Sequence, residues 1–268
     1  MRPLVLVTAL PTSQGVIELV SEAARLDITM EVYHPRQLAG CIDMKSIPIV
    51  RVGPETYDSV YAALATTTGN VHETIFNICR AFDKIASTSI ITSNHISMPD
   101  THIVESLEEF ERICDEHDFP LVVKEPRSNQ GVGVRCISSR DECGGIEFPC
   151  IVQEYIECGG SDTRVFVVGD RVVGAIRRSS TTSDFRSNLG LGGHATRVDP
   201  SDNIAELAVR TTQLHGLHFA GVDIISTESR DYVLEINSSP GFKIDKIAGG
   251  GIVSELLRYF QGINNSLY

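Results

Sequence analysis

The sequence predicts an α+β protein whose N-terminal part is a smaller α/β unit. Over the first 80 or so of the 268 residues, apolar runs alternate with amphipathic helical patterns, which is typical of a parallel sheet covered by helices. From about residue 121 the pattern changes to short β segments. Among these, Gly169-Asp170 between two apolar runs predicts a two-residue β-hairpin turn.

The N-terminal unit follows from strand and helix patterns taken in order. The apolar run from Pro3 to Leu10 predicts a buried strand, and Thr12-Ser13 then offers capping residues for a helix with apolar positions three and four apart. Two short strands and two further helical patterns come next, at residues 30–33, 47–52, 58–65 and 71–79.

A second unit begins near Asp83. A break at residues 98–101 precedes a helical stripe that starts at Ile103 and carries Ser106 and Glu109 as a capping box. The remaining strands and helices are expected at residues 121–124, 132–136, 151–155, 164–168, 171–173, 201–214, 221–226, 232–236 and 252–260.

Composition excludes several classes of protein. With 23 basic and 35 acidic side chains the net charge is −12, so nucleic acid is not expected as a main partner. No membrane span is expected, because no segment reaches the roughly 20 apolar residues that a bilayer requires. Seven cysteines without a C-x-x-C pair favour reduced thiols and a cytoplasmic location. His215 and His218 are expected at a helix end or on the surface rather than at a metal.

One candidate for phosphate binding is the segment after Lys124. This lysine ends an apolar strand, and a turn rich in small residues, 127–133, follows it. Glycines allow the backbone to approach a polyphosphate, and a lysine supplies a compact cation. Taken alone, the pattern is more often a simple hairpin. It is not a Walker loop, since no Gly-Lys-Ser/Thr follows.

A stronger candidate is a group of oxygen-bearing side chains on two late strands. Asp223 lies inside an apolar strand, and Glu235 and Asn237 are two residues apart on the next strand and therefore share a face. If the two strands form a hairpin, the three side chains converge, and such hard oxygen ligands suit magnesium held together with nucleotide phosphates. The alternative is that the carboxylates merely face solvent, but the apolar neighbours of Asp223 argue against it.

A third candidate is basic and rich in glycine. Arg177-Arg178 precedes Asp184-Phe185-Arg186-Ser187-Asn188, and Gly190, Gly192 and Gly193 follow. Arginines in such a segment could neutralise a phosphoryl group or the oxyanion of a tetrahedral intermediate. A surface basic pair is the simpler interpretation of Arg177-Arg178 alone.

In this order the motifs resemble the ATP-grasp superfamily and, within it, the RimK branch of ribosomal-protein glutamate ligases. The resemblance covers about residues 70 to 245, and the matching stretches are 82–84, 122–124, 130–133, 152–156, 162–165, 184–189, 192–193, 221–223 and 235–241. It implies an ATP-grasp fold preceded by a small Rossmann-like domain. The expected domains are residues 1–82, an N-terminal ATP-grasp subdomain 83–152, and a C-terminal subdomain 153–268 that carries the metal site.

The resemblance also implies roles for individual residues. Lys84 and Lys124 would contact the phosphates of ATP under a loop that includes Gln130, Gly131 and Gly133. The remaining nucleotide contacts would be an adenine hinge at Gln153, Glu154 and Tyr155, Asp162 near the ribose, and Arg186, Ser187 and Asn188 at the transferring phosphate. Two ions of magnesium or manganese would be held by Asp223, Glu235 and Asn237. Arg178, eight residues before Arg186, would neutralise the acyl phosphate, so that Arg178 and Arg186 are the candidate catalytic residues. Glu125 departs from the family, which more often has a neutral residue after the strand lysine.

The activity implied is an ATP-dependent ligase that activates a carboxylate as an acyl phosphate and joins it to an amino acid, with glutamate expected. The partners would be a small-molecule or peptide carboxylate acceptor and an amino acid donor, and the resemblance suggests a homo-oligomer. Two alternatives stay open: a small coenzyme precursor of the pterin or deazaflavin type as acceptor, and a non-catalytic ATP-binding module. A NAD-dependent oxidoreductase is set aside, because residues 10–15 lack Gly-x-Gly-x-x-Gly.

Overall fold

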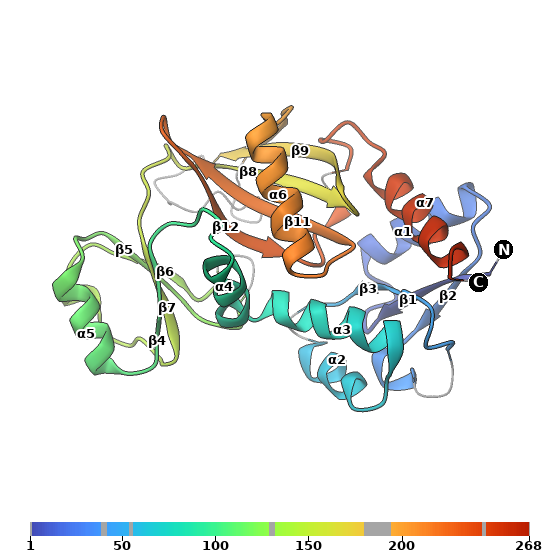
Figure 1. Ribbon diagram of the computed structural model, residues 1–268, viewed down its shortest axis with the longest axis horizontal. Helices are drawn as coiled ribbons and strands as arrows, with labels where there is room; N and C mark the ends of the chain where they lie inside the picture. Colours follow the sequence, from blue (N-terminus) through green and yellow to red (C-terminus); the bar gives the residue numbers. More distant parts are fainter. Residues whose placement is uncertain are drawn as a thin grey trace.

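The computed structural model describes residues 2–38, 42–53, 56–128, 132–179, 194–242 and 245–267. The chain begins with a parallel sheet of strand order β2-β1-β3 (Figure 1). Its strands are β1 (Leu4–Thr8), β2 (Met30–Tyr33) and β3 (Ile49–Arg51). The helical segments of this part are α1 (Gln14–Arg25), η1 (Pro35–Gln37), α2 (Tyr57–Leu64) and α3 (Gly69–Phe82).

Burial on both faces explains why the first strand is a continuous apolar run. Leu4 and Leu6 pack into one hydrophobic cluster with α1, whereas Val5 and Val7 pack into another with α3. A strand of a parallel sheet between two layers of helices needs apolar residues at every position. The strand expected at residues 3–10 is therefore confirmed, with its regular part ending at Thr8.

The middle of the chain forms an antiparallel sheet of order β4-β7-β5-β6 with a hydrophobic core of its own. Its strands are β4 (Thr101–Val104), β5 (Leu121–Lys124), β6 (Val134–Ile137) and β7 (Cys150–Glu154). Helix α5 (Leu107–Glu116) packs on it, and η3 (Arg140–Glu142) lies in the connection from β6 to β7. In Figure 1 this unit extends from the rest of the molecule on the side opposite the chain ends.

Two sequence-based expectations for this region were wrong. Ile103 lies in β4 rather than in the following helix, which begins after Ser106; the Ser106 hydroxyl accepts a hydrogen bond from the Glu109 amide at 3.2 Å. Capping at this position stops the helix from extending backwards. Helix α4 (Lys84–Ser93) was not predicted, since its Ser, Thr and Ile residues have weak helix propensity. Its N-cap is Asp83, whose carboxylate accepts from the Ile85 amide at 3.0 Å.

The last sheet is antiparallel and has the order β10-β9-β8-β11-β12. Its strands are β8 (Ser161–Val168), β9 (Arg171–Ser179), β10 (His194–Arg197), β11 (Phe219–Ser226) and β12 (Asp231–Asn237). One face packs against α6 (Asp202–Leu214) and the other against α7 (Ile252–Asn265), and both clusters also contain residues of the N-terminal sheet. These two sheets therefore share their cores. The expected domain division stays a prediction, and its boundary between residues 152 and 153 falls inside β7.

His215 has a structural role inside the core. His215 is the C-cap of α6 and is fully buried, with its ring nitrogens 2.9 Å from the Ser87 hydroxyl and 2.8 Å from the Thr211 carbonyl oxygen. Burial lowers the pKa of His215. The six cysteines in the described part of the chain are free. Within those same ranges, no helix has the length and apolar character required to cross a membrane.

The hairpin between β8 and β9 generates a stability prediction. Gly169 has a φ of 62°, and a Cβ atom there would lie 2.5 Å from the Tyr259 ring. We expect Gly169→Ala to lower the free energy of unfolding by about 1 to 3 kcal/mol in urea titration, from backbone strain and the clash. Gly144→Ala is the matched control, because no atom lies within 4 Å of its added Cβ. Equal stability of the two variants would contradict the prediction.

Candidate active site

Four charged side chains form a network on one face of the last sheet. Register brings them together: Asp162 of β8 lies opposite Arg178 of β9, and Arg164 of β8 lies opposite Asp223 of β11. Asp162 and Arg164 are two residues apart and so point to the same face. On the far side of Asp223, β12 contributes Glu235 as its cross-strand partner.

The network is paired at short distances. Arg164 donates to both carboxylate oxygens of Asp223, each at 2.6 Å. Arg178 donates from Nε to Asp162 at 2.7 Å and lies 2.7 Å from Asp223 through Nη2. Asp162, Arg178 and Asp223 are buried, with 8%, 3% and 3% of their surface exposed. The network therefore explains why a carboxylate stands inside the apolar strand β11.

Ion pairing decides the protonation of this network. Burial by itself would raise the pKa of Asp223, but the guanidinium groups of Arg164 and Arg178 outweigh it and hold that pKa below its usual range. For Arg178, burial opposes the charge, and Asp223 and Asp162 more than compensate, so that its pKa lies above the ordinary value. Asp223 and Arg178 therefore stay charged at neutral pH.

The expected metal ligands differ in what they offer a cation. Glu235 is 45% exposed, and its nearest described cation is Arg164 at 3.9 Å. Asn237, two residues on, uses its Oδ1 to accept a hydrogen bond from the Ser239 amide at 2.9 Å. Both oxygens of Asp223 already accept hydrogen bonds from arginine. The oxygen donor set fits magnesium, with Glu235 as the most available carboxylate.

Lys124 approaches these carboxylates from the four-stranded sheet, and Lys84 lies near Lys124. Lys124, at the end of β5, donates to Gln153 Oε1 at 2.7 Å, and Gln153 in turn donates to the Thr101 hydroxyl at 2.8 Å. Burial lowers the pKa of Lys124 to about 8; Glu235 and Asp223 oppose this decrease, whereas Lys84 adds to it. Lys84, at the start of α4, donates to the Ser128 carbonyl oxygen and lies 3.3 Å from the Ser128 hydroxyl. Lys124 thus lies near two of the expected metal ligands, Glu235 and Asp223, and Lys84 lies near Lys124.

Other predicted residues are only partly described. Gly133 has a φ of 68°, its carbonyl oxygen accepts from the Glu125 amide at 2.9 Å, and a Cβ there would lie 2.5 Å from the Glu125 carboxyl group. Glycine is therefore required next to Glu125. Five expected site residues lie outside the described ranges: Gln130, Gly131, Arg186, Ser187 and Asn188.

The residues expected at the adenine hinge lie at the end of β7. Glu154 is exposed and its carboxylate accepts from the Asp100 amide at 3.4 Å. Tyr155 is half-buried and its hydroxyl lies 3.5 Å from Glu157. Burial, followed by the charge of Glu157, raises the pKa of Tyr155. The carboxylate of Asp162, expected near the ribose, accepts a hydrogen bond from Arg178 Nε at 2.7 Å.

Sequence reasoning missed three residues beside the site. Arg164 was quoted only as part of a motif, although its position opposite Asp223 completes the ion pairs. Arg51, at the end of β3, donates to the Pro240 carbonyl oxygen at 2.8 Å and lies 4.3 Å from the centre of the Phe242 ring. Burial lowers the pKa of Arg51 to about 10. Ser238 is 4% exposed, and its hydroxyl has no hydrogen-bond partner among the described residues. A charge at the carboxyl end of a parallel strand could have drawn attention to Arg51.

A comparison with protein families identifies the family of the chain. The family model for the RimK-like ATP-grasp domain matches residues 81–260. The chain belongs to the RimK-like ATP-grasp family. This confirms the resemblance, and the matched region includes the two lysines and the charge network described above.

Curated relatives agree with this assignment. A probable alpha-L-glutamate ligase of Citrobacter koseri is 37% identical over 194 residues, which are 69% of this chain and 65% of that protein. A ribosomal protein bS6–L-glutamate ligase of Escherichia fergusonii has the same identity and coverage. The chain therefore spans slightly less than two thirds of the length of these relatives.

Solved structures confirm the fold over nearly the whole chain. The ATP-grasp ligase PsnB in complex with a minimal precursor superposes with a TM-score of 0.74 at 18% identity, covering 98% of this chain and 99% of that one. The D-cycloserine synthetase DcsG gives a TM-score of 0.72 at 17% identity and covers 100% of both chains. A mixed α and β protein with the ATP-grasp fold was the fold predicted from the sequence.

The contrast between Asp223 and Glu235 generates a prediction. We expect Asp223→Asn to lower the free energy of unfolding by about 3 to 5 kcal/mol, because it removes the carboxylate that pairs directly with the buried guanidinium groups of Arg164 and Arg178. Glu235→Gln, at an exposed position, should change it by less than about 1 kcal/mol. Urea unfolding followed by circular dichroism compares the two. Similar losses in both variants would show that the network does not carry the stability assigned to it.

Proposed function

We propose that this protein is an ATP-dependent carboxylate-amine ligase that joins a carboxylate to an amino acid, with glutamate as the expected amino acid. The observation that carries the proposal is that Lys124 lies near the carboxylates of Glu235 and Asp223, with Lys84 as a second cation near Lys124. Cations facing acidic oxygens suit a nucleotide triphosphate bound with magnesium. The names of the curated relatives support glutamate.

In this proposal Lys84 and Lys124 bind the phosphates of ATP, and Glu235 and Asn237 hold magnesium together with Asp223. Bound magnesium supplies positive charge to the phosphate oxygens during transfer. Two ions are expected from the family resemblance, and manganese could replace magnesium. Solved complexes of PsnB contain magnesium and ADP, which supports the binding of magnesium together with a nucleotide.

The reaction would proceed in two steps. An oxygen of the acceptor carboxylate attacks the γ-phosphorus of ATP, so that a new P–O bond forms while the bond to ADP breaks. The amine of the amino acid then attacks the acyl carbon, loses a proton and displaces phosphate. Because the reactants of the first step are both anionic, Lys84 and Lys124 reduce their repulsion.

The contacts of Arg178 change the role that was expected for it. Its Nε and Nη2 atoms face Asp162 and Asp223, and the side chain is buried. We therefore infer that Arg178 positions Asp223 rather than meeting the substrate directly. Direct stabilisation of the transferred phosphate would fall to Arg186, together with Ser187 and Asn188.

The acceptor is expected near Arg51, which has no acidic partner among the described residues. Its guanidinium lies between the carboxyl end of β3 and the segment after Asn237, so a substrate carboxylate could bind there. A protein or peptide acceptor is supported by the relative named for ribosomal protein bS6 and by the PsnB complex with precursor peptide PsnA2. A small coenzyme precursor remains the second candidate, and a non-catalytic ATP-binding module is the third.

Turnover tests the proposal. With ATP and magnesium, we expect ADP release that depends on both glutamate and an acceptor carboxylate, with a matching increase in acceptor mass. Glu235→Gln should abolish this release and leave the unfolding curve unchanged, since it removes a metal ligand at an exposed position. A panel of amino acids crossed with peptides and small acids identifies the substrates. Wild-type turnover in Glu235→Gln would contradict the assignment of Glu235 as a magnesium ligand.

The lowered pKa of Lys124 generates a prediction for nucleotide binding. With a pKa of about 8, the lysine loses its charge between pH 7 and pH 9 and attracts phosphate less. The dissociation constant of a non-hydrolysable ATP analogue should therefore rise by up to about tenfold over this range. Isothermal titration calorimetry measures it. Lys124→Arg, charged throughout, should show no such rise, and an equal rise in that variant would assign the effect to another group.

A further inference from the structure

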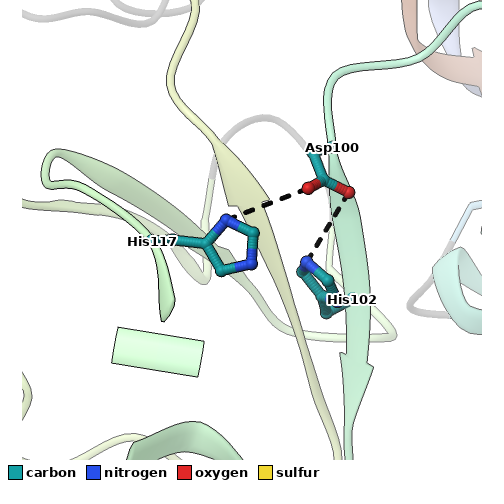
Figure 2. Close-up of side chains that lie close together, drawn as sticks. All are labelled: Asp100, His102 and His117. Atoms are coloured by element: carbon teal, nitrogen blue, oxygen red, sulfur yellow. Dashed lines mark ion pairs between the residues drawn. The ribbon is translucent and has the colours of Figure 1, made fainter. Parts of the chain in front are cut away.

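Three possible metal ligands lie outside the active site described above. Asp100, His102 and His117 gather at the edge of the four-stranded sheet, and both rings turn towards the Asp100 carboxylate (Figure 2). Asp100 directly precedes β4, His102 lies within β4, and His117 is the C-cap of α5. Two elements of the sequence thus converge on one point.

The strand register separates this group from the nucleotide site. Thr101 pairs with Gln153, whose side chain binds Lys124. The next pair, His102 with Val152, points to the opposite face. Val152 belongs to the core that includes α5, so His102 lies on the face that α5 covers. The group is therefore distinct from the expected magnesium ligands.

The backbone holds all three residues firmly. Glu154 donates its amide to the Asp100 carbonyl oxygen at 2.8 Å, which extends the pairing of β4 with β7 by one residue. His117 donates its amide to the Ile113 carbonyl oxygen at 3.0 Å and is the C-cap residue of α5. The side chains of His102 and His117 are 32% and 25% exposed, compared with 58% for Asp100. The group is half-buried, with Asp100 on the solvent side.

The distances leave room for a cation. His102 Nε2 lies 3.6 Å and His117 Nδ1 lies 3.8 Å from the two oxygens of Asp100. Both distances are too long for hydrogen bonds. Around a tetrahedral zinc ion with ligands at 2.0 to 2.1 Å, neighbouring ligand atoms are about 3.3 Å apart. The three ligand atoms lie within 4.8 Å of one another, so closure around an ion requires any two of them to approach by no more than about 1.5 Å.

A second observation comes from His102. Its Nε2 atom is shielded from solvent and has no hydrogen-bond partner within the described part of the chain. A buried polar atom without a partner is unfavourable, because it has lost its hydrogen bond to water and gained none in return. A metal ion at the centre of the group would satisfy this nitrogen and bind His117 and Asp100 with it.

We propose that Asp100, His102 and His117 form a binding site for a divalent transition-metal ion of the zinc class. Two imidazoles and one carboxylate are a ligand set that zinc prefers over magnesium. The fourth position of a tetrahedral ion is open to water. The ion fastens the end of α5 to β4 and stabilises this unit beside the expected adenine hinge at Glu154.

Zinc titration of the full-length, chelator-treated protein tests the site. We expect one zinc ion per chain in the presence of saturating magnesium, which occupies the other candidate metal site. Because binding involves only the folded state, zinc should raise the melting temperature. Cobalt should give the visible absorption of a four-coordinate ion without the near-ultraviolet band of thiolate ligation.

Matched variants identify the ligands. His102→Gln should raise the zinc dissociation constant by about 100-fold or more, since it removes a direct ligand, and the exposed Asp100→Asn should raise it by at least about tenfold. His95→Asn is the control, because His95 is exposed and has a φ of 54° that asparagine tolerates. Should His102→Gln fail to fold, Asp100→Asn carries the test.

Three outcomes would overturn the proposal. Zinc affinity that is the same in Asp100→Asn as in the wild type would remove the carboxylate from the site. A thiolate band with cobalt would assign binding to cysteine. Absence of zinc binding by the wild type would leave the group as imidazoles paired with a carboxylate. None of these results depends on ligase activity, so the test of the zinc site is independent of the test of the proposed function.

Discussion

The buried ion pairs of Asp223 with Arg164 and Arg178 are the constraint on which the rest of the site depends. Removing such charges from water costs several kcal/mol for each ion, and this cost is offset only when every charge meets a partner at good geometry. Here the partners come from β8, β9 and β11. A slip of one residue between these strands would turn the side chains to opposite faces and leave the charges unpaired.

This network also determines where chemistry is possible. Asp162, Arg178 and Asp223 form ion pairs within the network. Glu235 lies at its edge, and its side chain is 45% exposed. Gly221 contributes by its lack of a side chain, because an added Cβ would lie 3.1 Å from Pro240 and 3.3 Å from Arg164. The acidic edge thus faces Lys124 from the four-stranded sheet. That sheet has its own core, so the two sides of the site are built from separately packed units.

Most of the fold was predictable because apolar periodicity reflects burial. The N-terminal sheet, the hairpin at Gly169-Asp170 and the two final strands follow from that pattern. Helix α4 and strand β4 were not predicted, because a short polar helix and a four-residue edge strand show little periodicity of apolar residues. The group of Asp100, His102 and His117 was not predicted for another reason. His117 is 15 residues from His102 in the sequence, and only the packing of α5 on β4 brings them together.

The sequence alone was enough to identify the family, because the order of the motifs depends on residue type and spacing; the residues expected from that resemblance to bind ATP and metal stay predictions. It could not show that Asp162 and Arg178 bind one another, that Arg164 completes the pairing of Asp223, or that Arg51 reaches the segment after Asn237. Those contacts join residues between 16 and 189 positions apart. Only strand register and the packing of the N-terminal sheet decide them, since a charge acts over distance in space and not along the chain.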